Sequence, residues 1–576
     1  MNEMIQNLET VKHIEQMEGF LEIIKRYHDE PNYEYEKMAL SLMTGGDYAY
    51  DVDSYFTPVY YKQKIYPEKS MISIETLSYW QQRALETSNG ILMARYGDLV
   101  WNFSKKMDIR VDNVFRYAKI AIQGYISIVE DNLISDPFEL KTNILRALQL
   151  AKLLNQKEDI NKVQQTMLNL EKRISEDAEI GLWGFCFDTL ILEDNGSCIT
   201  IEQYSEIITE INGKFERLLK RMNESGEQLW YAVEYAVKKL LTYYRQNEKE
   251  KVTYILKEVE DSIDRSNCNS HLKEFRYQQL YEWYEFAQIH TETWRSRLIK
   301  KIEIVAKEGM DSFKEFSYKK ELNEKEVSSF ISQFITGDID LDRYTISLYF
   351  VPKIDEYEKR IQERSAAGIG VIQQLFNVKK TNEAGLAMAT LDMDDPKDQV
   401  AKEITFDFQL NSQYLAILLP KFIELYELGE DDFTALLSST PIHDPQNKEL
   451  LEVGIKHYLQ GDYLSSSHVL IPYIEATLRN IIHVVGGNIY KPNKKGGFDK
   501  ILLGDILASS ELKEILGEDA IFYFKLVYND VRGYNLRNNM AHGLVSPSYF
   551  NRFTIQLIIH TLLMLSTIGP AEEDTN

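Results

Sequence analysis

Apolar residues spaced three and four positions apart recur along this chain, and this spacing constrains the fold more than any other feature. One such stripe consists of Trp230, Val233, Val237, Leu240, Leu241 and Tyr244. The same spacing occurs in four further segments, 115–129, 138–154, 277–302 and 413–428. A stripe of this kind covers one face of an α-helix, which is then buried against a neighbouring element. The sequence therefore predicts an all-α protein with a long helical N-terminal region, which is either a solenoid or an irregular bundle.

The helical pattern is interrupted in the middle of the chain. RYTISLYFV (343–351) and EITFDFQL (403–410) alternate polar and apolar residues, and this period is typical of half-buried strands. We therefore expect a minor β insertion near 343–410. The predicted organisation is a helical N-terminal region at 1–340, a linker or insertion with short strands and one helix at 341–430, and a helical C-terminal domain at 431–576.

The charge balance restricts where nucleic acid can bind. The chain has a net charge of −24 and a pI near 5.0, so its long-range field repels phosphate and any such site must be local. Residues 476–545 are slightly basic, with nine Lys and Arg against seven Asp and Glu. Lys491, Lys494 and Lys495 cluster there in KPNKKGGFDK. We predict that they contact RNA, and a solvated basic loop is the alternative.

Other features predict a cytoplasmic protein without a membrane span. The start of the chain has no basic flank and no apolar core of a signal peptide. The longest apolar stretch, 555–568, contains Gln556 and His560 and is shorter than the roughly 20 residues that span a bilayer. We expect it to be a buried core helix. Three dispersed cysteines and the lack of paired His and Cys ligands predict no disulfide framework, no metal and no cofactor.

The segment NLRNNMAHG (535–543) contains the most chemically suggestive residues of the chain. Asn535 can cap a short helix, and Gly543 can end it in a left-handed turn. The motif is expected on a helix of about two turns or on a tight loop, and Arg537, Asn538 and His542 are the candidate catalytic residues. Arg537 and His542 lie five positions apart, and therefore roughly 140° around a regular helix. Either the long Arg537 side chain converges with His542 on one pocket, or one copy of the motif makes an incomplete pocket that a second subunit completes.

These residue types suit a phosphodiester. An imidazole exchanges protons near neutral pH, and a guanidinium presents a planar fork of donors to phosphate oxygens. RNA supplies its own nucleophile, the 2′-hydroxyl, so a base, an acid and a phosphate clamp can cleave it without a metal. Taken alone, however, Arg with His is a common combination on helices, and motif matches of this length carry a high false-positive risk.

A family resemblance adds to this interpretation. RNNMAHG resembles the motif of the HEPN superfamily (higher eukaryotes and prokaryotes nucleotide-binding), in which an Arg and a polar residue precede a His by a few positions. HVLIPYIEATLRNII (468–482) resembles an upstream helix of the same domain and brings in Glu475 and Arg479, although Tyr473 stands where a Gln is expected. The segment at 75–101 resembles, more weakly, the region that accompanies this domain.

The resemblance implies a fold, an activity and partners. HEPN domains are helical, often dimeric, and many are metal-independent endoribonucleases in toxin and phage-defence systems. It therefore implies that His542 is the general acid or base, that Arg537 binds phosphate, and that Asn538 orients one of these groups. Glu475 and Arg479 would support them. We expect a homodimer through residues 431–576, with the acidic N-terminal region or a regulatory partner protein restraining the activity.

Two other functions remain open at this point. The same pocket can belong to a noncatalytic scaffold that binds a nucleotide or an RNA end, or Arg537 and His542 can simply hold helices together. A structural arginine should be buried and make two parallel bonds to Glu475. A catalytic site should instead leave His542 accessible to solvent beside Arg537.

Overall fold

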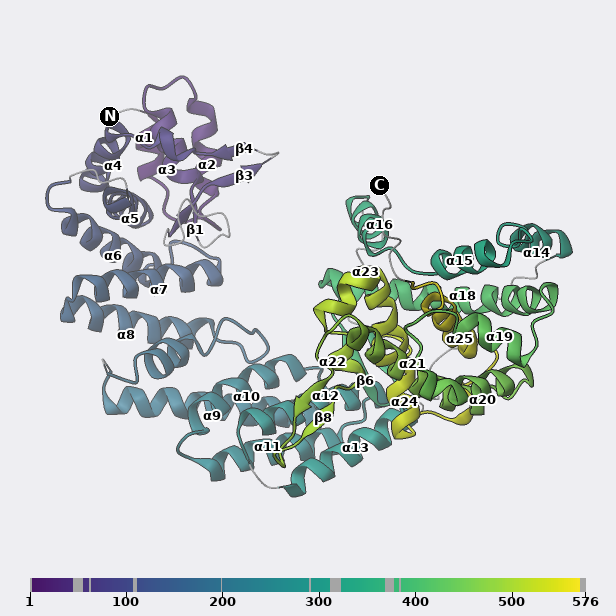
Figure 1. The fold of residues 1–576 in the computed structure, drawn as a ribbon. Coiled ribbons are helices and arrows are strands. Elements are labelled where there is room, and N and C mark those ends of the chain that lie inside the picture. The colour runs from purple at the N-terminus through teal and green to yellow at the C-terminus, as the bar shows by residue number, and fades with distance from the viewer. Residues whose placement is uncertain are drawn as a thin grey trace. The chain divides into compact units, whose positions relative to one another are not determined.

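The computed structural model describes residues 3–44, 55–61, 64–106, 111–197, 199–289, 292–310, 323–367, 378–382 and 385–569. Most of these residues are helical, and the strands are short, so the predicted all-α class is confirmed (Figure 1). The chain divides into two compact units, Met1–Leu298 and Ile299–Asn576.

The first unit is a succession of helices. Helix α7, for example, begins at Pro137 after the side-chain cap Asp136 and is followed by the left-handed C-cap Asn155. The helices are α1 (Glu3–Glu9), α2 (Gly19–Ile24), α3 (Tyr33–Ser41), α4 (Ile74–Glu86), α5 (Gly90–Lys106), α6 (Val114–Glu130), α7 (Pro137–Leu154), α8 (Lys157–Ile174), α9 (Ile201–Ser225), α10 (Trp230–Tyr244), α11 (Lys249–Arg265), α12 (Ser270–Phe286) and α13 (Glu292–Met310), which continues into the second unit.

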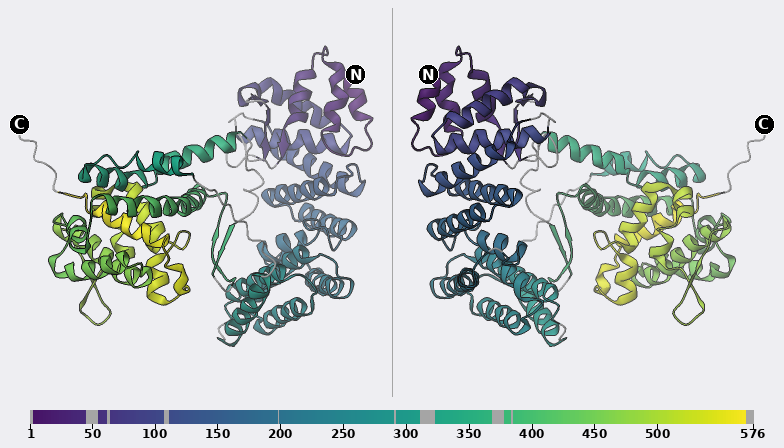
Figure 2. Two further views of the ribbon diagram at one scale, coloured as in Figure 1. Left: turned by 90° about the vertical axis from the view of Figure 1, so that its right-hand side faces the viewer. Right: turned by 90° about the vertical axis from the view of Figure 1, so that its left-hand side faces the viewer.

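From α4 to α12 the helices of this unit pack mainly on the next one or two along the chain. Figure 2 shows them as successive layers. The predicted stripe of α10 lies in these contacts, because Trp230, Val233, Val237, Leu240 and Tyr244 are all buried. The layered arrangement therefore follows from amphipathic helices that each need a neighbour on either side.

The second unit contains the candidate motif. Its helices are α14 (Glu324–Ile331), α15 (Ile339–Tyr349), α16 (Ile354–Ala366), α18 (Pro396–Leu425), α19 (Glu430–Leu437), α20 (Lys448–Leu459), α21 (Tyr463–Val484), α22 (Leu503–Ile506), α23 (Ser510–Phe524), α24 (Leu536–His542) and α25 (Thr554–Leu565). One apolar core runs through this unit from Phe334 to Leu565. It therefore includes residues from both sides of position 430.

Helix α25 occupies the centre of that core. All of its residues are buried, and it packs on α15, α18, α19 and α21 (Figure 1). The polar side chains within it are satisfied internally: His560 lies between the Tyr523 hydroxyl (2.8 Å) and the Ile346 carbonyl (3.2 Å). The prediction that the apolar stretch forms a buried core helix is confirmed.

The two strands predicted at 343–351 and 403–410 are wrong, because both segments are helical. The first lies mostly in α15, which starts after the side-chain cap Asp338, and the second lies inside α18, which starts at Pro396 after the cap Asp395. The buried positions of α18 recur every three or four residues along its 30 residues. A window of eight or nine residues is too short to separate this period from alternation.

Among the described residues, strands occur instead as four two-stranded antiparallel pairs. They are β1 (Met43–Thr44) with β2 (Phe56–Thr57), β3 (Val59–Tyr61) with β4 (Lys64–Tyr66), β5 (Val378–Thr381) with β6 (Ala387–Leu391), and β7 (Tyr490–Pro492) with β8 (Phe498–Lys500). Cys186 and Cys268 are free thiols, and Cys198 lies outside the described residues. Within the described ranges, no helix is both long and apolar enough to cross a bilayer.

Candidate functional site

The predicted motif lies on a short helix. Helix α24 has seven residues, or about two turns, and its buried Leu536 attaches it to the core. Gly543 ends the helix with a left-handed φ of 60°, as predicted. The expected cap at Asn535 is wrong. Asn535 is itself left-handed (φ 52°), and its side-chain oxygen accepts a bond from Asn538 Nδ2 (2.8 Å) rather than from the helix backbone.

The chain enters α24 through a tightly packed turn. The backbone amide of Tyr534 donates to the Leu526 carbonyl at 2.7 Å. A Cβ atom on Gly533 would lie 2.0 Å from the same oxygen, which is closer than any side chain tolerates. Leu526 belongs to a π-helical turn, Lys525–Asn529, at the end of α23. The position of the motif helix is therefore fixed by backbone contacts that only glycine permits at 533.

Arg537 is held by a carboxylate from α21. Its Nε donates to Glu475 Oε2 at 3.1 Å, and its Nη1 lies 3.4 Å from Asn538 Oδ1. Arg479, one turn along from Glu475, donates through Nη2 to Glu475 Oε1 at 2.9 Å. The expected contact between Glu475 and Arg537 is therefore present, with one carboxylate shared by two arginines.

The geometry of Arg537 differs from that of a purely structural arginine. Its side chain is 22% exposed, and it meets Glu475 through a single nitrogen rather than through a fork. Within the part of the chain that the structure describes, Nη2 has no partner. Glu475 thus orients the guanidinium through Nε, while part of its donor fork remains available to an anion.

His542 lies at the end of α24 and is exposed. Among the described residues its imidazole makes no hydrogen bond or ion pair, so both ring nitrogens are available. Asn538 is less free, because its Nδ2 is bound to Asn535 and lies 3.5 Å from Asn529 Oδ1. The structure therefore brings Arg537, Asn538, Glu475 and Arg479 into one network and leaves His542 outside it.

The predicted RNA-binding lysines lie on the β7–β8 hairpin. Every strand residue of this hairpin is exposed. Lys491 pairs with Asp505 at 2.5 Å, whereas the ammonium groups of Lys494 and Lys495 have no partner in the described part of the chain. Arg479 Nε donates to the Ile501 carbonyl at 2.9 Å, directly after β8. The base of the hairpin is therefore bound to the same arginine that holds Glu475.

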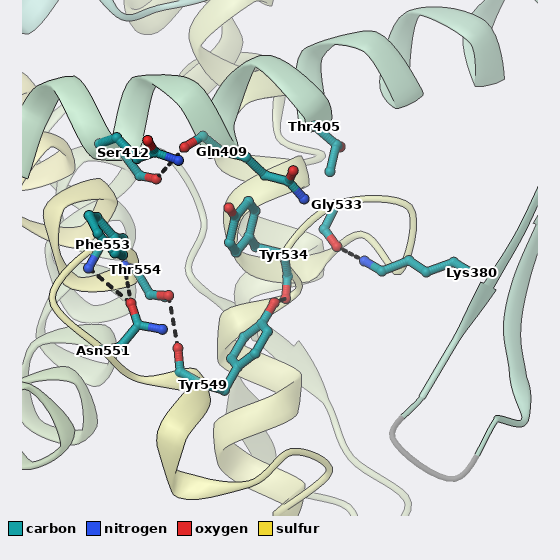
Figure 3. A pocket seen from close by; sticks show the side chains of 11 residues that line it. Lys380, Thr405, Gln409, Ser412, Gly533, Tyr534, Tyr549, Asn551, Phe553 and Thr554 are labelled. Atoms are coloured by element: carbon teal, nitrogen blue, oxygen red, sulfur yellow. Dashed lines mark hydrogen bonds between the residues drawn. The ribbon is translucent and has the colours of Figure 1, made fainter. Parts of the chain in front are cut away.

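A cavity of about 460 Å³ lies beside the motif (Figure 3). Its walls come from α18, from β5, and from the segments that directly precede α24 and α25. The notable side chains are Lys380, Tyr534 and Tyr549, none of which was singled out from the sequence. The two tyrosines flank the motif in the sequence, and this proximity could have identified them as candidate site residues. Lys380 is 153 positions from its partner Gly533 and has no such signal.

The described residues contain no group of three or more His, Cys, Asp or Glu side chains placed to hold a metal ion. Two buried histidines of the second unit are also unsuited to proton exchange near neutral pH. Burial lowers the pKa of His443 and that of His560 to about 4, so both are neutral. His542, in contrast, is exposed.

Comparison with known proteins adds one partial match. The family described as Domain of unknown function (DUF7380) matches residues 72–163, which lie in the first unit and include the buried ion pair between Asp98 and Arg146 (2.7 Å). No curated protein and no solved structure matches the chain. The match does not reach α24, so any function for the motif rests on its geometry and chemistry.

Proposed function

We propose that the second unit is a metal-independent endoribonuclease of the HEPN type. The observation that carries this proposal is the arrangement on α24: an accessible, unpartnered His542 follows an Arg537 that Glu475 orients and does not fully occupy. A guanidinium held in this way is prepared for a phosphate before substrate arrives, and such preorganised charge is a major source of rate enhancement.

The proposed reaction uses the RNA's own 2′-hydroxyl. The 2′-oxygen attacks the adjacent phosphorus and forms a new bond, while the bond from phosphorus to the 5′-oxygen breaks. The 2′-proton passes to a base, and the departing 5′-oxygen receives a proton. His542 performs one of these two transfers, and Arg537 stabilises the charge on the phosphate oxygens. The products are a 2′,3′-cyclic phosphate end and a 5′-hydroxyl end.

The remaining residues of the network have positioning roles in this proposal. Glu475 orients Arg537, Arg479 orients Glu475, and Asn538 limits the movement of the guanidinium. The β7–β8 hairpin carries the unpaired charges of Lys494 and Lys495 toward the RNA backbone. Because a free ribonuclease harms its host, we further propose a regulated role, as a toxin or in phage defence, with the first unit or a partner protein as the restraint.

The proposal is tested with the full chain and a labelled RNA in excess EDTA. Cleavage should persist in EDTA, should leave a 2′,3′-cyclic phosphate, and should fail when the 2′-hydroxyl at the scissile position is replaced by hydrogen. His542→Ala should lower the cleavage rate by at least about 100-fold, as expected for loss of a general acid or base. Its melting temperature should stay unchanged, because the imidazole is exposed and has no partner.

His483→Ala provides a matched control, because His483 is also an exposed histidine of the second unit, at the end of α21. It should cleave at the wild-type rate. Undiminished cleavage by His542→Ala would remove the proposed catalytic role. RNA that binds without being cut by the wild-type chain would favour the noncatalytic scaffold instead.

A further inference from the structure

The cavity beside α24 combines three kinds of group. One wall is aromatic, one carries a half-buried cation, and one carries side-chain amides (Figure 3). Its volume of about 460 Å³ is within the usual range of small-molecule sites. Arg537 and His542 do not line this cavity, so it is a site separate from the proposed catalytic residues.

The cation is Lys380, on β5. Its ammonium donates to the Gly533 carbonyl, and among the described residues no carboxylate lies within ion-pair distance of it. Burial lowers its pKa. The nearby Asp530 is already bound by Arg532, at 2.6 Å and 3.1 Å. A half-buried ammonium whose neighbouring carboxylate is bound by another cation favours an incoming anion, because the anion restores the interaction that burial removed.

The aromatic wall is made by Tyr534 and Tyr549. Their ring centroids are 6.2 Å apart and the ring planes are inclined by 46°. The Tyr549 hydroxyl donates to the Tyr534 carbonyl at 3.0 Å, which fixes the ring in place. Rings held in this way present an apolar π surface on which a planar heterocycle can stack.

The amides come from α18. Gln409 and Gln413 line the cavity one turn apart, and both are exposed. In the described part of the chain, neither side-chain amide has a hydrogen-bond partner. Figure 3 shows the Gln409 amide reaching toward Gly533 and Tyr534. An amide offers both donors and an acceptor, which matches the mixed hydrogen-bonding edge of a nucleobase.

We propose that this cavity binds one nucleotide unit, with its phosphate on Lys380, its base against Tyr534 and Tyr549, and its base edge at Gln409 and Gln413. The unit is either a link of an RNA strand or a free nucleotide. As a link of RNA it rests on the proposed function, since it would hold the substrate beside α24. As a free nucleotide it requires no cleavage.

Occupancy of the cavity acts on the motif through the segment 532–534. Three consecutive carbonyls there are held by side chains: that of residue 532 by Thr405 (3.4 Å), that of 533 by Lys380, and that of 534 by Tyr549 (3.0 Å). The last carbonyl also accepts from Asn539 of α24 at 2.9 Å. A phosphate that draws Lys380 away from Gly533 therefore releases one of the contacts that position the motif helix.

The test is equilibrium binding by calorimetry, with the full chain carrying His542→Ala so that RNA stays intact. The probes are adenosine 5′-monophosphate, uridine 5′-monophosphate, ribose 5-phosphate and a ten-nucleotide RNA. Lys380→Met should weaken the binding of at least one nucleotide-containing probe by 10-fold or more. Lys379→Met is the matched control, since Lys379 is the exposed neighbour on the same strand, and it should stay within twofold of the parent protein.

A second variant keeps the inference testable if Lys380→Met fails to fold. The double substitution Gln409→Ala and Gln413→Ala changes only exposed side chains, and it should reduce the preference for nucleotides over ribose 5-phosphate at least fivefold. Lys380-dependent binding of mononucleotides alone would identify free nucleotide as the ligand, and Lys380-dependent binding of RNA alone would identify the strand. Equal binding by all variants, or no binding by the parent protein, would overturn the inference.

These outcomes are separable from the proposed ribonuclease activity. Nucleotide binding that depends on Lys380 in a chain that never cleaves RNA would refute the proposed activity and support the inference that the cavity binds a nucleotide. Normal cleavage by a wild-type chain whose cavity binds no probe would refute the inferred nucleotide binding and support the proposed activity.

Discussion

At the scale of single residues, the decisive feature is the way Arg537 is held. One nitrogen of its guanidinium is engaged by Glu475 at 3.1 Å, and the side chain retains 22% exposure. Arginine meets both requirements of this position, because its planar fork can face a carboxylate on one side and a phosphate on the other. Lysine has the same charge without this geometry.

We therefore expect Arg537→Lys to lower the cleavage rate by about 100-fold, the scale seen when one transition-state donor is lost. The fold should be retained, because lysine keeps the positive charge that faces Glu475. The measurements are single-turnover cleavage and thermal unfolding. Arg552→Lys, at an exposed arginine of the same unit, is the control and should behave as the wild type. Full activity of Arg537→Lys would show that charge alone suffices.

At the scale of elements, the β7–β8 hairpin is an exposed basic feature of an acidic protein. Lys494 and Lys495 lie in its turn with no partner among the described residues, whereas Lys491 is paired with Asp505. Replacing Lys494 and Lys495 together by Ala should weaken RNA binding and should reduce the slope of log affinity against log salt by about 1.4, two contacts at 0.7 each for a single strand. Lys491→Ala should change the slope less. Identical slopes in all three proteins would exclude the hairpin from the RNA interface.

The central helix α25 makes the second unit sensitive to acid. Burial lowers the pKa of His560 to about 4, below the value of about 6.5 in an unfolded chain. The unfolded state therefore takes up a proton first as pH falls. The stability that His560 contributes is complete above about pH 6.5 and is lost toward pH 4, with a decrease of about 2 kcal/mol at pH 5.

His443 shows the same direction, so two residues contribute to this acid sensitivity. His560→Gln should remove about half of the fall in unfolding free energy between pH 7 and pH 5, measured with urea for the second unit. A fall as large as that of the wild type would show that His560 is protonated in the folded state.

The elements also show which parts of the structure the sequence predicts. Long helices such as α10 and α25 were predictable because their apolar period extends over many turns. The segments 343–351 and 403–410 were not, since each is a short window cut from a helix. The contact between Glu475 and Arg537 was expected from a family resemblance rather than from physical reasoning. Lys380 was missed because its site forms only when chain segments 153 positions apart meet.

At the scale of the whole molecule, we expect two chains to complete one site. Arg537 and His542 lie five positions apart on α24, hence on different sides of the helix, and His542 is outside the network around Arg537. A two-fold pairing of second units would bring two motifs together. A dimer should therefore be measurable by sedimentation equilibrium of the full chain.

Mixing Arg537→Ala chains with His542→Ala chains tests this arrangement. If each site draws residues from both chains, mixed dimers contain one intact combination and should recover up to about a quarter of the wild-type activity, since about half of the dimers are mixed and each holds one of two sites. A mixture as inactive as either variant would show that each motif acts alone. A fragment limited to 431–576 is unsuitable for such work, because α15 and α18 supply part of its core.

The burial of α25 also bears on the order in which the protein is made. A ribosome releases α15, α18 and α21 well before α25. Until α25 emerges, the apolar faces of these three helices lack the buried helix on which they pack. Domains fold as units during synthesis, so the core that holds α24 is incomplete while α25 is still inside the ribosome. A nascent chain would thus carry every residue of the proposed site before it carries an assembled one. Interrupted synthesis would therefore release a chain in which the proposed site is not assembled.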